Sequence, residues 1–158
     1  MRARHVFPSL ALVGALVVAL SGCATTVALT PADAANDPAC ADVMVRLPDT
    51  VAGQARRSTN AQSTAAWGDP ASVILRCGLP DSGPSPLPCF TVDNIDWLRD
   101  AAKDPSFTFV TYGRIPAVEV LIDSTAVSGT SALSDLSAAV GTLEPLHACL
   151  DATDPLGN

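Results

Sequence analysis

A short apolar run near the N-terminus ends in Leu20–Cys23 (Leu-Ser-Gly-Cys), and this motif most limits what the rest of the chain can fold into. Arg2 and Arg4 precede the run. A basic start, an apolar centre and small residues before a cleavage point are typical of a secretory signal peptide. A cysteine directly after the small residues is the acceptor of diacylglyceryl in bacterial lipoproteins. We therefore expect residues 1–22 to be a lipoprotein signal peptide and Cys23 to be the lipidated mature N-terminus.

A transmembrane helix is the alternative interpretation of the same run, and its length argues against it. The stretch from Val6 to Leu20 is shorter than the ~20 residues that a helix needs to cross a bilayer, and Pro8 interrupts it. Two or three acyl chains on Cys23 would anchor the protein stably, because each buried methylene contributes ~0.8 kcal/mol. The expected location is the outer face of the cell membrane, with the membrane as a partner through this lipid anchor.

Removal of the signal leaves enough chain for one domain with a hydrophobic core, but too little for two. Residues 24–36 are rich in Ala, Thr, Pro and Asp and lack sustained periodicity, so we expect residues 23–36 to be a flexible tether. Residues 37–158 are then a single domain.

The charge balance excludes one class of partner. Without its signal the chain keeps seven basic residues against sixteen acidic ones, and only Arg56 and Arg57 are adjacent. No basic stripe can form that would neutralise phosphates, so we expect no nucleic-acid partner. The sequence also contains no glycine-rich phosphate loop and no zinc-protease motif, so neither a cofactor nor a metal is expected.

Four cysteines remain once Cys23 is assigned to the lipid. An even number in an oxidising compartment predicts two disulfides, and no pair has the Cys-x-x-Cys spacing typical of metal or redox sites. We predict a bond between Cys77 and Cys89, because a stiff proline-rich loop separates them. The second bond would then join Cys40 to Cys149.

Two stretches carry apolar residues at helical spacing. The first begins at Asp37-Pro38, an N-cap followed by a first-turn proline, and ends before Pro48. The second covers residues 131–140, with Ser131 as its expected N-cap. The predicted apolar stripes are Cys40, Val43, Met44 and Leu47 in the first helix, and Leu133, Leu136 and Val140 in the second.

Between these helices the apolar residues alternate with the period of two that is typical of strands. We expect a loop or weak edge segment at residues 49–63, a proline-rich loop at 78–88 and a tight hairpin turn at Asp93-Asn94. The fold class is therefore α+β, an antiparallel sheet of about five or six short strands with two helices packed on one face. The expected strands are 64–67, 72–77, 90–92, 95–98, 107–112 and 117–122.

Three longer motifs occur together, at residues 67–70 (Trp-Gly-Asp-Pro), 75–78 (Leu-Arg-Cys-Gly) and 89–98 (Cys-Phe-Thr-Val-Asp-Asn-Ile-Asp-Trp-Leu). With the Ala-Cys and Leu-Pro-Asp-Thr of the first helix, they resemble a family of small actinobacterial envelope proteins classified as a domain of unknown function. The resemblance covers most of the mature chain. It implies an envelope location and supplies no catalytic residues. Members commonly have Asn-Gly where this chain has Asp93-Asn94, a departure that should leave the hairpin intact.

Residues that could perform catalysis are explained more simply by structure. His147, the one histidine outside the signal, lies two residues from Cys149, a spacing at which side chains point apart. No Gly-x-Ser-x-Gly motif supplies a nucleophile. Asp69, Asp93 and Asp96 could suggest a carboxylate pair or a calcium site, but each stands where aspartate serves turns.

Arginine and tryptophan form the candidate ligand site. Arg76 lies inside an apolar strand and Arg114 in a hairpin turn, and Trp67 or Trp97 could line an anion site beside them. The simpler interpretation, which we prefer, is that Arg76 pairs with a cross-strand carboxylate and that both tryptophans fill the core.

These observations favour a non-enzymatic accessory or binding protein, held at the membrane by Cys23, with an envelope protein or glycan as its partner. The alternative is an envelope hydrolase or transferase whose carboxylates are dispersed along the chain.

Overall fold

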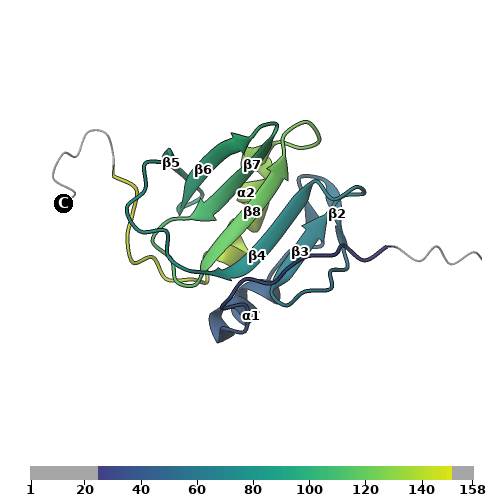
Figure 1. The fold of residues 1–158 in the computed structure, drawn as a ribbon, viewed down its shortest axis with the longest axis horizontal. Coiled ribbons are helices and arrows are strands. Elements are labelled where there is room, and N and C mark those ends of the chain that lie inside the picture. The colour runs from purple at the N-terminus through teal and green to yellow at the C-terminus, as the bar shows by residue number, and fades with distance from the viewer. Residues whose placement is uncertain (1–24, 151–158) are drawn as a thin grey trace, which may run out of the picture.

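An eight-stranded antiparallel sheet forms the centre of the fold (Figure 1). The computed structural model describes residues 25–150, so the predicted signal peptide and Cys23 lie outside the described residues. The strands are β1 Thr50–Val51, β2 Gln54–Arg57, β3 Thr64–Trp67, β4 Val73–Leu79, β5 Cys89–Val92, β6 Ile95–Lys103, β7 Ser106–Thr111 and β8 Ala117–Asp123.

The strand order β1-β2-β3-β4-β8-β7-β6-β5 consists of two meanders joined at the centre of the sheet. β4 pairs with β8 in antiparallel register from Val73 opposite Ile122 to Cys77 opposite Val118. The hairpin turn at Asp93-Asn94 has positive φ at both residues, 47° and 64°, as a primed turn requires. The predicted hairpin is therefore confirmed.

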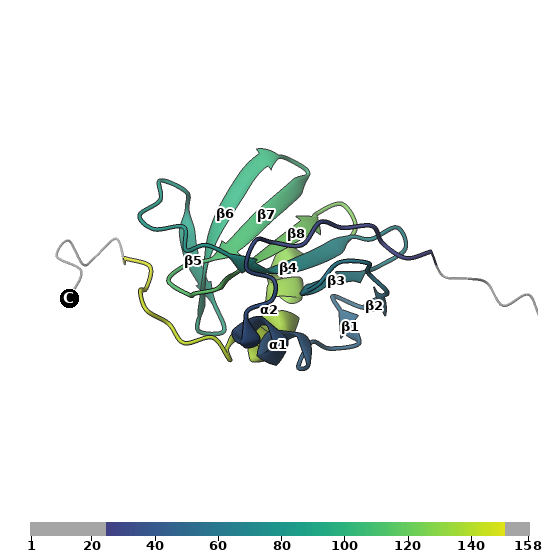
Figure 2. The ribbon, with the colours of Figure 1, turned by 60° about the horizontal axis from the view of Figure 1, so that its bottom comes forward.

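Both helices lie on the same face of the sheet (Figure 2). α1 spans Pro38–Met44, and its N-cap is Asp37, whose carboxylate accepts the Ala39 N–H at 2.8 Å. α2 spans Gly129–Val140. Its N-cap is Ser128 rather than the expected Ser131, because the Ser128 hydroxyl accepts the Ser131 N–H. None of the helices in the described range is long and apolar enough to span a membrane.

The core lies between the helices and the inner face of the sheet. Alternate residues of the central strands point into it and are fully buried, including Leu75 on β4 and Val120 on β8. The predicted α+β class is confirmed, with eight strands among the described residues in place of five or six. The additional hairpin is β1–β2, which lies at one edge of the sheet, in the segment expected to be a loop or a weak edge segment. Strands of two and four residues with no apolar alternation give no periodic signal.

The described part of the segment expected to be a tether, residues 25–36, lies against the domain. Val27 pairs with Thr59, and the Ala34 N–H donates to the carbonyl oxygen of Gly78 at 3.0 Å. Arg57 donates from Nη2 to the carbonyl oxygen of Thr25 at 2.7 Å. An extended segment held through its backbone needs no apolar periodicity, which is why its sequence resembles a linker.

The four cysteines form two disulfides, but the predicted pairing is wrong. The bonds are Cys40–Cys77, which joins α1 to the central strand β4, and Cys89–Cys149, which joins the edge strand β5 to the C-terminal segment. β4 lies at the centre of the sheet and β5 at its edge, so β8, β7 and β6 separate the two ends of the proline-rich loop. Stiffness between two cysteines does not bring them together when the strands on which they lie are not neighbours.

Gly78 allows the N-terminal segment to approach β4. Its φ is +110°, and a Cβ there would lie 2.5 Å from backbone atoms of Ala34 and Ala35. We expect Gly78→Ala to lower the free energy of unfolding by about 2–4 kcal/mol, because backbone strain and steric overlap add. Gly53→Ala is the matched control, since Gly53 also has positive φ but has nothing within 4 Å of the added Cβ. Urea unfolding that gives equal losses for both variants would contradict this packing.

The two disulfides should contribute differently to stability. Their sequence separations of 37 and 60 residues give each an estimated loop-closure contribution of about 4 kcal/mol. Cys40 and Cys77 are also fully buried, so replacing both by Ala removes core contacts as well. We expect that double variant to lose more stability in urea than the Cys89→Ala/Cys149→Ala variant. Peptide mapping without reduction should recover Cys40 linked to Cys77, and recovery of Cys77 linked to Cys89 would refute the assignment.

Candidate functional site

The predicted arginine and tryptophan site is not assembled in the fold. Trp67 and Trp97 are fully buried in the core. Arg76 points to the other face of the sheet, where its Nη2 lies 2.7 Å from the Glu119 carboxylate on the neighbouring strand β8. This geometry matches the simpler of the two interpretations of Arg76. Because alternate residues of a strand face opposite sides, Arg76 and the tryptophans cannot share a pocket.

Arg114 has a structural environment of its own in the turn between β7 and β8. Its side chain is buried and donates to the carbonyl oxygens of Leu143 and Asn94. Burial lowers the pKa of Arg114 from its ordinary value, and the nearby carboxylates of Asp96 and Glu144 counteract this shift. Arg114 therefore ties the segment after α2 to the β5–β6 turn, and it offers no open anion site together with Arg76.

The aspartates considered above for chemistry make structural contacts, some of them with residues distant in the sequence. Asp69 pairs with Arg57 at 2.8 Å, and the Asp93 carboxylate accepts the Ser134 hydroxyl. Asp96 accepts the Thr91 hydroxyl at 2.6 Å and the Cys149 N–H at 2.8 Å. Within residues 25–150, no group of three or more His, Cys, Asp or Glu side chains is arranged to hold a metal ion.

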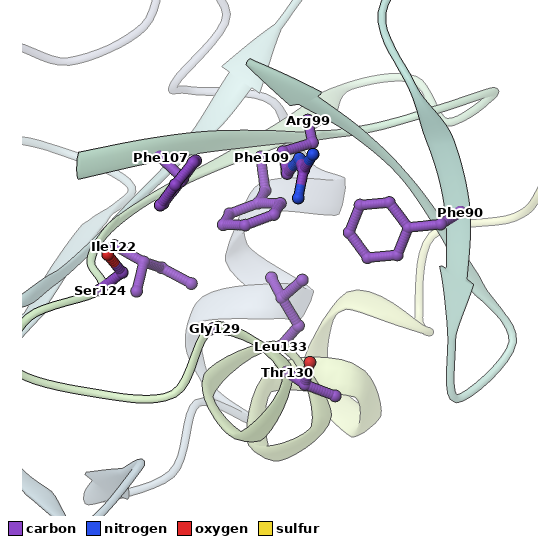
Figure 3. A pocket seen from close by; sticks show the side chains of 9 residues that line it. All are labelled: Phe90, Arg99, Phe107, Phe109, Ile122, Ser124, Gly129, Thr130 and Leu133. Carbon is purple, nitrogen blue, oxygen red and sulfur yellow. The ribbon is translucent and has the colours of Figure 1, made fainter. Parts of the chain in front are cut away.

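A cavity of about 280 Å³ lies elsewhere, between the inner face of β5–β7 and the first turn of α2 (Figure 3). We call it the phenylalanine pocket, because all three phenylalanines outside the signal line it. The Phe90 and Phe109 rings meet edge to face, and their centroids are 5.9 Å apart. The centroid of the Phe107 ring lies 6.5 Å from that of Phe109. The complete lining is Phe90, Arg99, Phe107, Phe109, Ile122, Ser124, Gly129, Thr130 and Leu133.

The sheet and helix α2 bring these residues together from distant parts of the chain. Phe107 and Phe109 alternate along β7, so both face the helices, and Arg99 on β6 stands directly opposite Phe109 in the strand register. Leu133 comes from α2 and is 1% exposed. The sequence signal was present, because Phe107 and Phe109 have the spacing of one strand face. That spacing alone does not show that Phe90 and Arg99 lie beside these rings, because this follows from the pairing of β5, β6 and β7.

Arg99 lies over the pocket wall. Its guanidinium carbon is 5.8 Å from the centroid of the Phe107 ring, within the range of a cation–π contact. No carboxylate of the described chain lies within 4.0 Å of this guanidinium. The pocket thus combines an apolar lining with one cation that no acidic side chain neutralises.

The family model for "Protein of unknown function (DUF3515)" matches residues 6–148. The chain belongs to the DUF3515 family. No curated protein and no solved structure gives a significant match. The matched range contains every helix and strand described above and all residues that line the phenylalanine pocket, so the pocket lies within the DUF3515 domain. The two disulfides of the chain indicate an extracytoplasmic protein, because such bonds persist in oxidising compartments.

The Asp123 carboxylate accepts hydrogen bonds within the turn that leads from β8 to the pocket. Asp123 accepts the hydroxyl of Thr125 at 2.6 Å and its N–H at 2.9 Å, and these hydrogen bonds lower the pKa of Asp123 below its ordinary value. A depressed carboxyl pKa in the folded state stabilises the fold above the unfolded-state pKa, and this contribution is lost as pH falls through the folded-state pKa.

We therefore expect Thr125→Val, which removes the hydroxyl donor, to raise the pKa of Asp123 toward its ordinary value. An NMR titration of the Asp123 side chain would measure this shift. An unchanged titration midpoint would mean that the hydroxyl does not stabilise the carboxylate. Thr130→Val is the matched control, because no hydrogen bond joins that exposed threonine to Asp123.

Proposed function

We propose that this protein is a lipid-anchored, extracytoplasmic binding protein of the bacterial envelope and that the phenylalanine pocket is its ligand site. The anchor would be Cys23, at the end of the Leu-Ser-Gly-Cys motif. A lipoprotein of this kind reaches the outer face of the cell membrane, where an oxidising environment suits the two disulfides. The resemblance to actinobacterial envelope proteins supports the same location.

The observation that carries the proposal is the pocket itself. Its volume of about 280 Å³ is near the lower end for small-molecule sites, which are typically concave, mostly apolar and supplied with few polar groups. The phenyl rings, Ile122 and Leu133 supply the apolar surface, while Arg99 and two hydroxyl groups supply the polar contacts. These side chains suit binding better than catalysis, because the lining includes no carboxylate, histidine or cysteine.

A hydrolase with dispersed carboxylates is the competing proposal. Such an enzyme needs two carboxyl groups about 5–9 Å apart on either side of a bound substrate. The aspartates considered above instead accept hydrogen bonds from nearby hydroxyls and backbone groups, or pair with arginine. The geometry therefore supports binding as the first function to test, with a small molecule in the pocket. An envelope protein or glycan remains a predicted partner of the protein outside the pocket.

The anchor is tested by metabolic labelling with a fatty acid in a bacterial host that processes lipoproteins. Wild-type protein should incorporate label and sediment with membranes. Cys23→Ser should remain unlabelled, because serine offers no thiol to the diacylglyceryl transferase. Equal labelling of the variant would refute the lipid anchor. It would not bear on the pocket, which the binding experiment below tests.

The pocket is tested with the fluorescent aryl sulfonate 1-anilinonaphthalene-8-sulfonate on the folded, disulfide-bonded domain. We expect saturable binding of one probe per chain. Phe107→Ala should weaken it by about tenfold, since burying such a side chain is worth about 1.5–3 kcal/mol. Ile115→Ala is the control, because Ile115 is 57% exposed and does not line the pocket. Unsaturable binding, or equal affinity in Phe107→Ala, would reject the pocket as a ligand site.

A further inference from the structure

We infer that the phenylalanine pocket recognises a small amphiphilic acid, an apolar body with a single anionic group that pairs with Arg99. This inference rests on the proposed binding function and specifies its ligand. Three features of the pocket support it: the size of the cavity, the change from apolar to polar surface along its lining, and the unpaired charge of Arg99.

The cavity volume sets the size of the apolar body. An apolar protein cavity of about 150 Å³ accommodates one benzene molecule. The phenylalanine pocket measures about 280 Å³, so it fits a body about twice that size. A two-ring aromatic group or an acyl chain of about ten carbons meets this requirement.

The lining changes from apolar to polar between its buried and exposed residues. The buried part consists of Ile122, Leu133 and Phe109, which are at most 6% exposed. Phe90 and Phe107 are half-buried, and Arg99 is exposed to solvent. Figure 3 shows the Arg99 guanidinium beside the Phe109 ring, on the side toward Phe90, and Leu133 reaching toward these rings from α2. A ligand that lays its apolar body on the buried residues would therefore place its polar end near Arg99.

Arg99 differs from the other arginines of the described chain in having no partner for its guanidinium. Every other one donates a side-chain hydrogen bond to a carboxylate or a backbone carbonyl. Arg99 makes neither a side-chain hydrogen bond nor an ion pair there, and it contacts the Phe107 ring instead. A guanidinium supported by an aromatic face and free to donate suits a carboxylate, sulfonate or phosphate, which it can grip with two parallel hydrogen bonds.

Acidic neighbours do not supply this missing partner. Asp100 follows Arg99 on β6 and therefore faces the opposite side of the sheet, where its carboxylate accepts the Ala102 N–H. The Asp123 carboxylate accepts both donors of Thr125. An external anion is therefore the natural counter-charge for Arg99.

The test compares an acid with a neutral molecule of the same shape. Decanoate and methyl decanoate provide the acyl pair, and 2-naphthoate and 2-methylnaphthalene provide the aromatic pair. Affinities are measured by displacement of the fluorescent sulfonate and checked by calorimetry. We expect at least one acid to bind wild-type protein about tenfold or more tightly than its neutral partner, because a charge-assisted bond to Arg99 forms only with the acid. The pair that shows this preference identifies the acyl or aromatic class.

Arg99→Gln removes the charge and keeps a polar side chain of similar reach. We expect it to abolish the preference for the acid while leaving the affinity for the neutral molecule within about twofold. Arg46→Gln is the matched control with the same change in net charge, because Arg46 lies on the surface beyond α1 and pairs with Asp42. Since Arg99 is exposed, the midpoint of urea unfolding of the variant should equal that of the wild-type protein, and this measurement verifies that its fold is intact.

The outcomes separate the two proposals. Equal binding of acid and neutral molecule, or an unchanged preference in Arg99→Gln, would overturn the acid specificity and leave the pocket as an apolar binding site. Absence of saturable binding by every probe, including the fluorescent sulfonate, would overturn the binding function and the acid specificity together. A loss of preference in Arg46→Gln equal to that in Arg99→Gln would show that net charge is responsible and would also reject the specific role of Arg99.

Discussion

The pairing of β4 with β8 is the interaction on which the rest of the structure depends. It is the contact between two meanders, one built from the first half of the domain and the other from the second. The inward side chains along this seam, such as Leu75 and Val120, are fully buried beneath the helices. The Cys40–Cys77 bond fixes α1 to the same seam. Helix α2 contacts strands on both sides of this seam, β1 in the first meander and β5 and β8 in the second, so one core is shared by the two meanders.

The phenylalanine pocket lies beside this central seam, between the second meander and helix α2. α2 begins at Gly129, and its first turn lies against the inner face near β7 and β8. The outer part of the second meander contributes Phe90 and Arg99, which complete the cavity. The pocket therefore joins residues of β5–β8 to the N-terminal part of the twelve-residue helix α2.

The sequence was sufficient to predict the elements whose residues carry a period, and insufficient for features that depend on how elements meet. Alternation along residues 117–122 identified a strand and its inward face, and Asp93-Asn94 identified a turn. For the β1–β2 hairpin the sequence left a loop and a weak edge segment as alternatives, because these strands have too few residues to show alternation. The disulfide pairing was mispredicted because distance along the chain was used where strand order decides.

The candidate site shows the same limit. Arg76 attracted attention because it interrupts an apolar strand, yet Glu119 on β8 provides its partner. Arg99 gives no such signal, because it follows the last residue of the predicted strand 95–98, where an arginine beside Asp100 looks like an ordinary surface residue. Its distinguishing property is that its guanidinium has no hydrogen-bond or ion-pair partner within the described structure. A sequence alone does not show which carboxylates lie close to a given arginine in the fold. The three phenylalanines likewise became a site only through the register of β5, β6 and β7.

The attachment of the N-terminal segment to the domain determines how the protein would stand on a membrane. The backbone of Thr25 is held by Arg57 at the β2 side of the sheet, and Cys23 is only two residues, at most about 7 Å of chain, away. With a lipid on Cys23, the domain would rest close to the bilayer by its β2 side, whereas the phenylalanine pocket belongs to the opposite half of the sheet, toward β5. The lipid would then hold one end of the sheet at the bilayer, and the phenylalanine pocket at the other end would face molecules in the space beyond the membrane surface.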